Sequence, residues 1–296
     1  MRKGVAAVHG ADPRLRAVSP AGCGEATASS LILIGDELLS GQVRDVQTTW
    51  LASRLAAHGA PVERVQMIPD CVADIADAVR REVERGGGRI LVTVGGLGPT
   101  PDDLTYAGVA RALRVPLVHS RTVARFVRRW ANQDARDDEG LAAMMRMALV
   151  PEGSRVLDGD GPVAVADVGG GASAGGTTIV MLPGVPEHAR AVFDPLVVRV
   201  LLTHCAEPDR ASIDIFHDLP ESALASCFRL VERAGDQYQL GSYCGTPMVL
   251  RLSGPAAGVR SVEGRLRQHL NELGSRGPTV APPPVGTVRS ITAAHT

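Results

Sequence analysis

Short apolar runs alternate with segments of helical spacing through the first two thirds of the chain. The apolar runs have the length and the β-branched content of buried strands, and the segments between them place apolar residues three or four positions apart. This alternation is typical of a mostly parallel sheet covered by helices on both faces. The predicted strands are Leu31–Gly35, Val62–Ile68, Arg89–Val94, Pro116–Val118 and Thr178–Leu182, and the predicted helices are Thr48–His58, Asp74–Arg85, Asp102–Leu113 and one from Pro183 to about Leu202.

The remaining segments divide the chain into further parts. Residues 121–148 have a long polar helical pattern, and the glycine-rich stretch Gly159–Gly176 is interpreted as a mobile loop or a weak hairpin. Past residue 205 the pattern changes to that of a small α+β module. We therefore expect a disordered extension over 1–28, an α/β domain over 29–205, a small α+β domain over 206–273 and a disordered proline-rich tail over 274–296.

Composition and charge remove several classes of function. The 296 residues contain 31 basic and 32 acidic side chains, so no net field attracts nucleic acid or an anionic membrane. Lys3 is the only lysine, which excludes a P-loop or Schiff-base lysine within the folded part. The five cysteines form no Cys-x-x-Cys pair, and no apolar run reaches the ~18 residues needed to span a bilayer. A cytoplasmic protein without a nucleic-acid or membrane partner is expected.

The segment from Val92 to Thr105 combines a strand, a glycine-rich turn and a predicted helix start. Glycines at such a turn let backbone amides approach a phosphate, and the helix N-terminus favours negative charge. Acidic side chains at the same turn would repel a phosphate unless a divalent cation lay between them. The alternative is purely structural, with Thr100 capping the helix and Asp103 completing a capping box. The candidate residues are Gly95, Gly96, Gly98, Pro99, Thr100, Asp102, Asp103 and Thr105.

Two other predicted strands also end in acidic residues. Asp36 and Glu37 follow Gly35, with Gly41 shortly after, and Asp70 follows the second strand. Because parallel strands end at the same edge of a sheet, these side chains are expected to face one crevice. The alternative for each acid taken singly is a turn residue or a helix cap.

A fourth strand runs into a turn flanked by prolines. Pro183, Gly184 and Pro186 form either a rigid wall of a ligand site or a plain strand-to-helix connection. The histidines, His188 among them, lack metal-ligand spacing and are interpreted as surface or packing residues. The basic run Arg121–Arg129 is interpreted as a solvated helix face. No catalytic triad is apparent.

These motifs resemble those of the N-terminal family of competence/damage-inducible protein A (CinA), which contains a MoaB/Mog-type molybdopterin-binding domain. The resemblance covers about residues 30–273 and rests on the order of its motifs. It implies a three-layer α/β/α domain followed by a smaller α+β domain, and usually a homo-oligomer. The motifs that carry it are Gly35–Gly41, Gly95–Thr105, Leu182–Pro186 and Gly241–Tyr243.

The same resemblance implies metal-dependent hydrolysis of nucleotide diphosphates such as ADP-ribose or FAD. It places the catalytic acids at Asp70 and Asp103 and a Mg, Mn or Co ion at Asp102 and Asp103. A carboxylate-bound cation would polarise the phosphate, and a second carboxylate would orient or deprotonate water. The expected ligand-binding residues are Gly35, Asp36, Glu37, Gly41, Asp45, Gly95, Gly96, Gly98, Pro99, Thr100, Thr105, Pro183, Gly184 and Pro186.

Several departures from the family pattern leave alternatives open. Asp45-Val46-Gln47 stands where the family has D-T-N, Gly161–Val165 replaces a G-T-A-P-G loop, and Cys244 replaces a proline after Gly241-Ser-Tyr. The deamidase domain of longer relatives has no counterpart in the sequence, so pyridine-nucleotide deamidation is not expected. The alternatives to hydrolysis are molybdopterin binding in cofactor biosynthesis and a non-catalytic nucleotide-binding module.

Overall fold

The structure is a computed structural model that describes residues 28–134, 138–202, 210–274 and 288–290. The chain divides into two compact units, residues 1–206 and 207–296. The expected disorder of residues 1–28 falls almost wholly outside the described residues.

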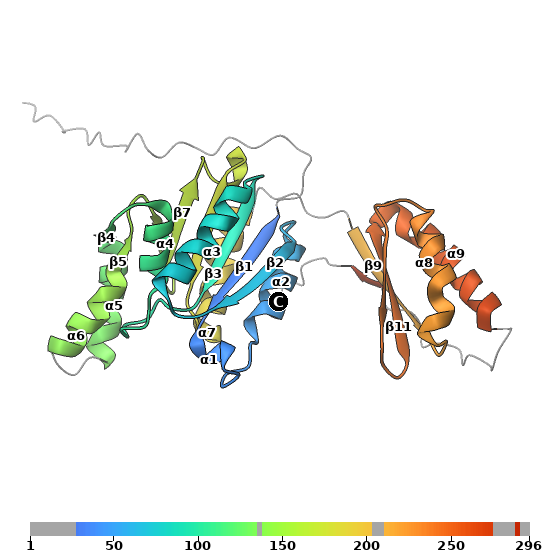
Figure 1. Cartoon of the computed structure of the whole chain (residues 1–296), viewed down its shortest axis with the longest axis horizontal. Helices are drawn as coiled ribbons and strands as arrows, with labels where there is room; N and C mark the ends of the chain where they lie inside the picture. Colours follow the sequence, from blue (N-terminus) through green and yellow to red (C-terminus); the bar gives the residue numbers. More distant parts are fainter. Residues whose placement is uncertain (1–27, 135–137, 203–209, 275–287, 291–296) are drawn as a thin grey trace, which may run out of the picture. The chain divides into compact units, whose positions relative to one another are not determined.

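The first unit is built on a six-stranded sheet with the order β2-β1-β3-β8-β7-β6 (Figure 1). The first four of these strands are parallel, β7 is antiparallel to β8, and β6 is antiparallel to β7. This is the mostly parallel sheet that the alternating pattern predicted. The strands are β1 (Ser29–Ile34), β2 (Val62–Ile68), β3 (Arg89–Val94), β6 (Arg155–Leu157), β7 (Val163–Val168) and β8 (Thr177–Leu182).

Helices cover both faces of this sheet, because successive residues of the central strands point to opposite sides. Ile32 and Ile34 pack on the face covered by α3, α4 and α5, whereas Leu31 and Leu33 pack on the face covered by α2, α7 and the π-helical segment η3. The result is a three-layer α/β/α unit with two apolar cores. The helices are α1 (Asp36–Leu39), α2 (Gln47–Ala57), α3 (Val72–Arg85), α4 (Thr105–Leu113), α5 (Arg121–Asp134), α6 (Asp138–Met145), α7 (Pro186–Val192) and η3 (Phe193–Leu202).

The structure corrects three predictions in this unit. The glycine-rich stretch contains strand β7, which pairs antiparallel with β8 as the hairpin alternative expected. Residues 163–166 are completely or almost completely buried, so this is a core strand and not a mobile loop. The strand predicted at Pro116–Val118 is β4 (Leu117–His119), which pairs with β5 (Leu149–Pro151) in a separate two-stranded sheet. The helix predicted from Asp102 begins at Thr105, because the turn before it is closed by other hydrogen bonds.

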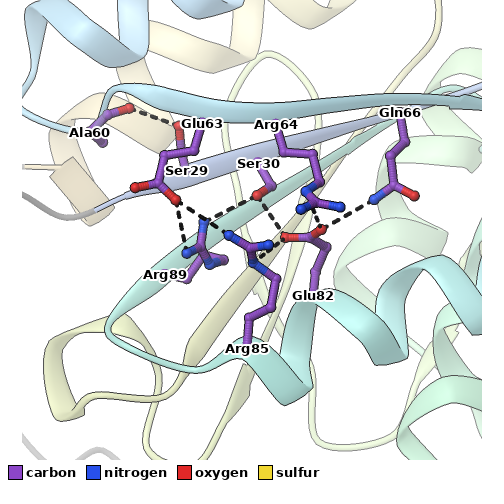
Figure 2. A network of polar contacts seen from close by, with 9 residues as sticks. All are labelled: Ser29, Ser30, Ala60, Glu63, Arg64, Gln66, Glu82, Arg85 and Arg89. Atoms are coloured by element: carbon purple, nitrogen blue, oxygen red, sulfur yellow. Dashed lines mark hydrogen bonds and ion pairs between the residues drawn. The ribbon is translucent and has the colours of Figure 1, made fainter.

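A polar network lies at the amino ends of β1, β2 and β3 (Figure 2). The carboxylate of Glu82, which is 1% exposed, accepts hydrogen bonds from Ser30 Oγ at 2.7 Å and Gln66 Nε2 at 3.2 Å. Arg64 Nε and Arg85 Nε lie 3.6 and 3.7 Å from its two oxygens. Buried acids are stable only when paired in this way, so the network fastens α3 to the sheet.

The second unit contains a four-stranded antiparallel sheet with the order β10-β11-β9-β12. Helices α8 and α9 pack on one face of it through Ile213, Ile215, Leu250 and Leu252. Strand β12 falls in the tail that was expected to be disordered, and the rest of that tail lies outside the described residues. The elements are β9 (Arg210–His217), η4 (Glu221–Leu224), α8 (Ala225–Glu232), β10 (Gln239–Tyr243), β11 (Met248–Pro255), α9 (Ala256–Gly274) and β12 (Val288–Ser290).

Candidate functional site

A cavity of about 1000 Å³ lies at the carboxyl ends of the parallel strands. The turns after β1, β2, β3 and β8 all contribute to its wall, as expected for a ligand site in an open parallel sheet. Most of the residues predicted from the sequence line it. These are Gly35, Glu37, Asp70, Gly95, Gly96, Gly98, Pro99, Thr100, Asp102, Asp103, Pro183, Gly184 and Pro186.

The glycine-rich turn after β3 is held closed by the carboxylate of Asp103. Its Oδ1 accepts a hydrogen bond from Gly98 N at 2.6 Å, and its Oδ2 accepts from Thr100 N at 2.7 Å and Thr100 Oγ1 at 2.6 Å. Arg146 Nη2 donates to Pro99 O at 2.5 Å from the other side. Asp103 therefore shapes the turn, as the capping alternative required. Its predicted catalytic and metal-binding roles stay predictions.

Glycines at this turn are required by the close approach of three chain segments. Gly95 has φ 103°, and a Cβ there would collide with the backbone carbonyl of Ile34. The Cα of Gly95 also lies 3.1 Å from the position of a Cβ on Gly184. Within the described residues, the N–H groups of Gly96 and Leu97 donate no hydrogen bond to the protein. The turn therefore offers the cavity backbone donors of the kind that bind phosphate oxygens.

Acidic side chains from three different turns interact at the carboxyl ends of the strands, and Glu37, Asp70 and Asp102 among them line the cavity. Burial raises the pKa of Asp70 above its ordinary value. The N–H of Asp36, which donates to Asp70 Oδ2 at 3.0 Å, works against this increase. The negative charges of Glu37, Asp36 and Asp102 raise the Asp70 pKa further. Within the described ranges none of these four carboxylates forms an ion pair with a basic side chain.

Four predicted site residues lie outside the wall of the main cavity. Asp36 acts through its N–H, which holds Asp70, and the buried Thr105 donates from Oγ1 to Gly95 O at 2.7 Å. Asp45 Oδ1 accepts from Gln47 N at 2.8 Å, which places it at the start of α2 and beside a small cavity of about 80 Å³. Gly41, at φ 73°, lines neither of these two cavities.

Aromatic side chains that the sequence patterns did not indicate form a further part of the cavity wall, called here the aromatic wall. Phe126 and Trp130 from α5 and His188 from α7 form it. The basic run in α5 is thus not wholly a solvated face, since Arg129 also borders the cavity, and His188 is a cavity residue. A usable signal was present, because aromatic residues make up only 3% of the chain and two of them stand four positions apart on this helix.

The acidic side chains of the cavity suit a cation that is shared with a ligand. In the part of the chain that the structure describes, no three His, Cys, Asp or Glu side chains converge closely enough to hold a metal by themselves. Magnesium bound together with substrate phosphates needs only one or two protein carboxylates. Asp70 and Asp102 fit that arrangement, because both line the cavity, the negative charge of Asp102 raises the pKa of Asp70, and neither has a basic partner among the described residues.

Comparison with known proteins places this fold in a family. Residues 30–203 match the family model described as "Probable molybdopterin binding domain". The chain belongs to this family. A protein of Aeropyrum pernix is 36% identical over 230 residues, which cover 74% of this chain and 81% of that protein. The expected MoaB/Mog-type domain is thereby confirmed.

The CinA resemblance is also confirmed. A CinA-like protein of Myxococcus xanthus is 35% identical over 185 residues, which cover 61% of this chain and 41% of that protein. The crystal structure of CinA from Thermoplasma acidophilum, a protein described as having unknown function, matches with a TM-score of 0.51 and 26% identity, covering 60% of this chain and 99% of that one. No helix among the described residues of this CinA-like chain is long and apolar enough to cross a membrane.

Proposed function

We propose that this molybdopterin-binding-domain protein hydrolyses the diphosphate bond of a nucleotide such as ADP-ribose or FAD with the help of a divalent cation. One observation carries the proposal. Carboxylates that have no basic partner among the described residues lie beside a glycine turn whose N–H groups at Gly96 and Leu97 bind nothing else in that part of the chain. Both line one cavity that is large enough for a dinucleotide. Donors alone would suit a bare phosphate, whereas donors together with acids suit a phosphate that carries a metal ion.

Each side chain has a separate task in this proposal. The N–H groups of Gly96 and Leu97 hold the non-bridging oxygens of one phosphate. Asp102 would hold the cation, which would supply charge neutralisation at the phosphate. Asp70 accepts a proton from the attacking water. The oxygen of that water bonds to phosphorus while the bridging P–O bond breaks, and the second phosphate leaves with the bridging oxygen. Asp103 acts as a positioning residue, because its carboxylate sets the shape of the turn.

The test is release of AMP from ADP-ribose and from FAD by the purified protein, with Mg, Mn or Co against EDTA. We expect turnover with a metal and none with EDTA. Asp70→Asn should abolish it, whereas Glu63→Gln, which changes an acid at the opposite end of the sheet, should leave it unchanged. Absence of AMP release from both substrates with all three metals would contradict the proposal.

Molybdopterin binding is the second candidate, and the match to the molybdopterin-binding-domain model favours it. The same cavity would take the pterin and its phosphate. Tight molybdopterin binding without AMP release would support this candidate over the hydrolase. Binding of ADP-ribose without turnover would instead indicate a non-catalytic nucleotide-binding module. A homo-oligomer and the absence of nucleic-acid and membrane partners remain predictions.

A further inference from the structure

The three rings of the aromatic wall, Phe126, Trp130 and His188, contact one another in an ordered arrangement. The ring centroids of Phe126 and Trp130 lie 6.5 Å apart with their planes tilted by 42°. The imidazole of His188 meets the Trp130 ring at 6.5 Å in an edge-to-face arrangement, with an interplanar angle of 85°. Two separate helices, α5 and α7, supply these rings. The indole of Trp130 is therefore oriented by neighbours on two elements and still borders the cavity.

The other tryptophan of the chain, Trp50, has a packing role and serves as a comparison for Trp130. Trp50 packs edge-to-face on the fully buried Phe193, with 5.2 Å between centroids, and the guanidinium of Arg190 lies 5.6 Å from its ring. Trp50 does not border the main cavity, whereas Trp130 does. The contrast separates a packing role for Trp50 from a contact surface at Trp130.

Small residues keep the space beside the aromatic wall open. Gly159 and Gly161 lie in the loop between β6 and β7, and both line the cavity. A Cβ on Gly161 would stand 3.1 Å from Val192 Cγ1 and 3.9 Å from Phe126 Cζ. Arg129 borders the same space, and within the described residues it forms no ion pair. A flat group that enters here would meet aromatic rings and a free guanidinium.

We propose that Phe126, Trp130 and His188 form a subsite for the planar fused heteroaromatic ring of the ligand. Such a ring stacks on or packs edge-on against aromatic side chains, and a guanidinium beside it adds hydrogen bonding. The ring and the phosphates would then occupy different walls of one cavity. The proposal rests on the proposed function for the phosphate position, but ring binding itself requires no hydrolysis.

Tryptophan fluorescence can test this directly, because the chain has only two tryptophans. Trp50→Phe leaves Trp130 as the sole reporter, and Trp130→Phe leaves Trp50 as a matched control. We expect ADP-ribose to change the emission of Trp130 in a saturable way and to leave the emission of Trp50 unchanged. Ribose 5-phosphate, which lacks the fused ring, should change neither. Circular dichroism of both variants establishes that they are folded.

A second readout is the affinity for ADP-ribose compared with that for ribose 5-phosphate. A purely structural role of Trp130 would change both affinities equally. Trp130→Ala should weaken ADP-ribose binding about 10-fold or more, the range expected for loss of one stacked base, while ribose 5-phosphate binding stays within twofold. Calorimetry with AMP and with a simple pterin identifies which ring the subsite prefers, and binding of either ring supports the proposal. Equal losses for ADP-ribose and ribose 5-phosphate would indicate general damage to the cavity and would overturn it.

The two proposals can fail separately. Saturable quenching of Trp130 without AMP release would contradict the hydrolase and leave the ring subsite standing. AMP release with an unchanged KM in Trp130→Ala would support the hydrolase and overturn the ring subsite. Emission changes of equal size at Trp50 and Trp130 would also overturn it, because they would report a change in the whole fold.

Discussion

The two ends of the parallel sheet both carry acidic side chains, but the acids are paired with arginines at only one end. At the amino end, Glu82 and Glu63 are surrounded by Arg64, Arg85 and Arg89, with Arg89 Nη2 only 3.0 Å from Glu63 Oε2 (Figure 2). At the carboxyl end, Asp70 and the acids around it have no basic partner within the described residues. Burial raises the pKa of Asp70, and repulsion by the neighbouring acids raises it further.

The comparison shows which acids the fold itself needs. A buried carboxylate with several donors stabilises its surroundings, and its removal leaves those donors unsatisfied. A group of carboxylates that repel one another destabilises the folded chain, and it is tolerated where a ligand or cation relieves the repulsion. We interpret the amino end as structural and the carboxyl end as functional, and the following substitutions test that distinction.

The largest expected effect is on stability at the amino end. Glu82→Ala removes the acceptor of Ser30 and Gln66 and leaves arginines near an empty space. The free energy of unfolding should fall by about 3–5 kcal/mol, because one partner of a buried charged network is lost. For a unit of this size the melting temperature should fall by about 10 °C. Thermal melting followed by circular dichroism measures it.

Glu63→Gln is the matched control at the same end. Glu63 is half exposed, and exposed ion pairs contribute at most about 1 kcal/mol. A loss in Glu63→Gln as large as that in Glu82→Ala would contradict the view that burial of Glu82 gives the network its strength.

The next effect is on activity at the carboxyl end. Asp70→Asn keeps an oxygen that can accept the hydrogen bond from Asp36 N but removes the charge. We expect metal-dependent AMP release to fall about 100-fold or more, since a positioned general base typically contributes about 10²–10⁴-fold. Steady-state kinetics with ADP-ribose and saturating metal measures it. A rate within threefold of the unmodified protein would remove Asp70 from the proposed chemistry.

A smaller effect separates Asp103 from its neighbour Asp102. Asp103→Asn turns an amide N–H₂ toward a backbone N–H of Gly98 or Thr100, which should cost about 1–2 kcal/mol of stability. Asp102 is exposed and accepts neither backbone N–H of Gly98 nor that of Thr100, although a hydrogen bond from the Thr100 side chain lowers its pKa. Asp102→Asn should therefore cost less stability than Asp103→Asn while reducing metal-dependent activity. Urea unfolding of the two variants measures the difference. Equal stability with lost activity in Asp103→Asn would favour the metal-ligand role predicted from the sequence.

The smallest effect is the pH dependence of stability. Because the pKa of Asp70 is raised in the folded chain, the folded state binds its proton more tightly than the unfolded state. Ionised Asp70 therefore lowers the free energy of unfolding as the pH rises through the raised pKa. In EDTA, Asp70→Asn should be more stable than the unmodified protein at pH 7.5 and equal to it near pH 3.5. Urea unfolding at the two pH values measures it, and a destabilised variant at pH 7.5 would contradict the repulsion.

The sequence determined the parallel sheet and most of the candidate site, because both depend on local patterns. Val62–Ile68 and Arg89–Val94 are strands with the predicted bounds. The second is a continuous buried run of a central parallel strand, whereas the first is the edge strand β2, whose residues are exposed or half-buried and which its β-branched and alternating residues identify. The residues after these strands could be placed at one edge for the same reason. The burial of strand β7 was not predicted, because its four buried residues stand between glycine-rich stretches that indicate a loop or a weak hairpin.

Only the tertiary structure decided what each acid does and what faces it. Asp103 and Asp70 look alike in sequence as acids beside strand ends, yet three donors surround the first and three negative charges the second. The aromatic wall depends on α5 and α7, which are separated by more than 50 residues and meet only when the core forms. Local periodicity reports which side of an element is buried, whereas charge pairing and ring contacts depend on distances that only the folded chain sets.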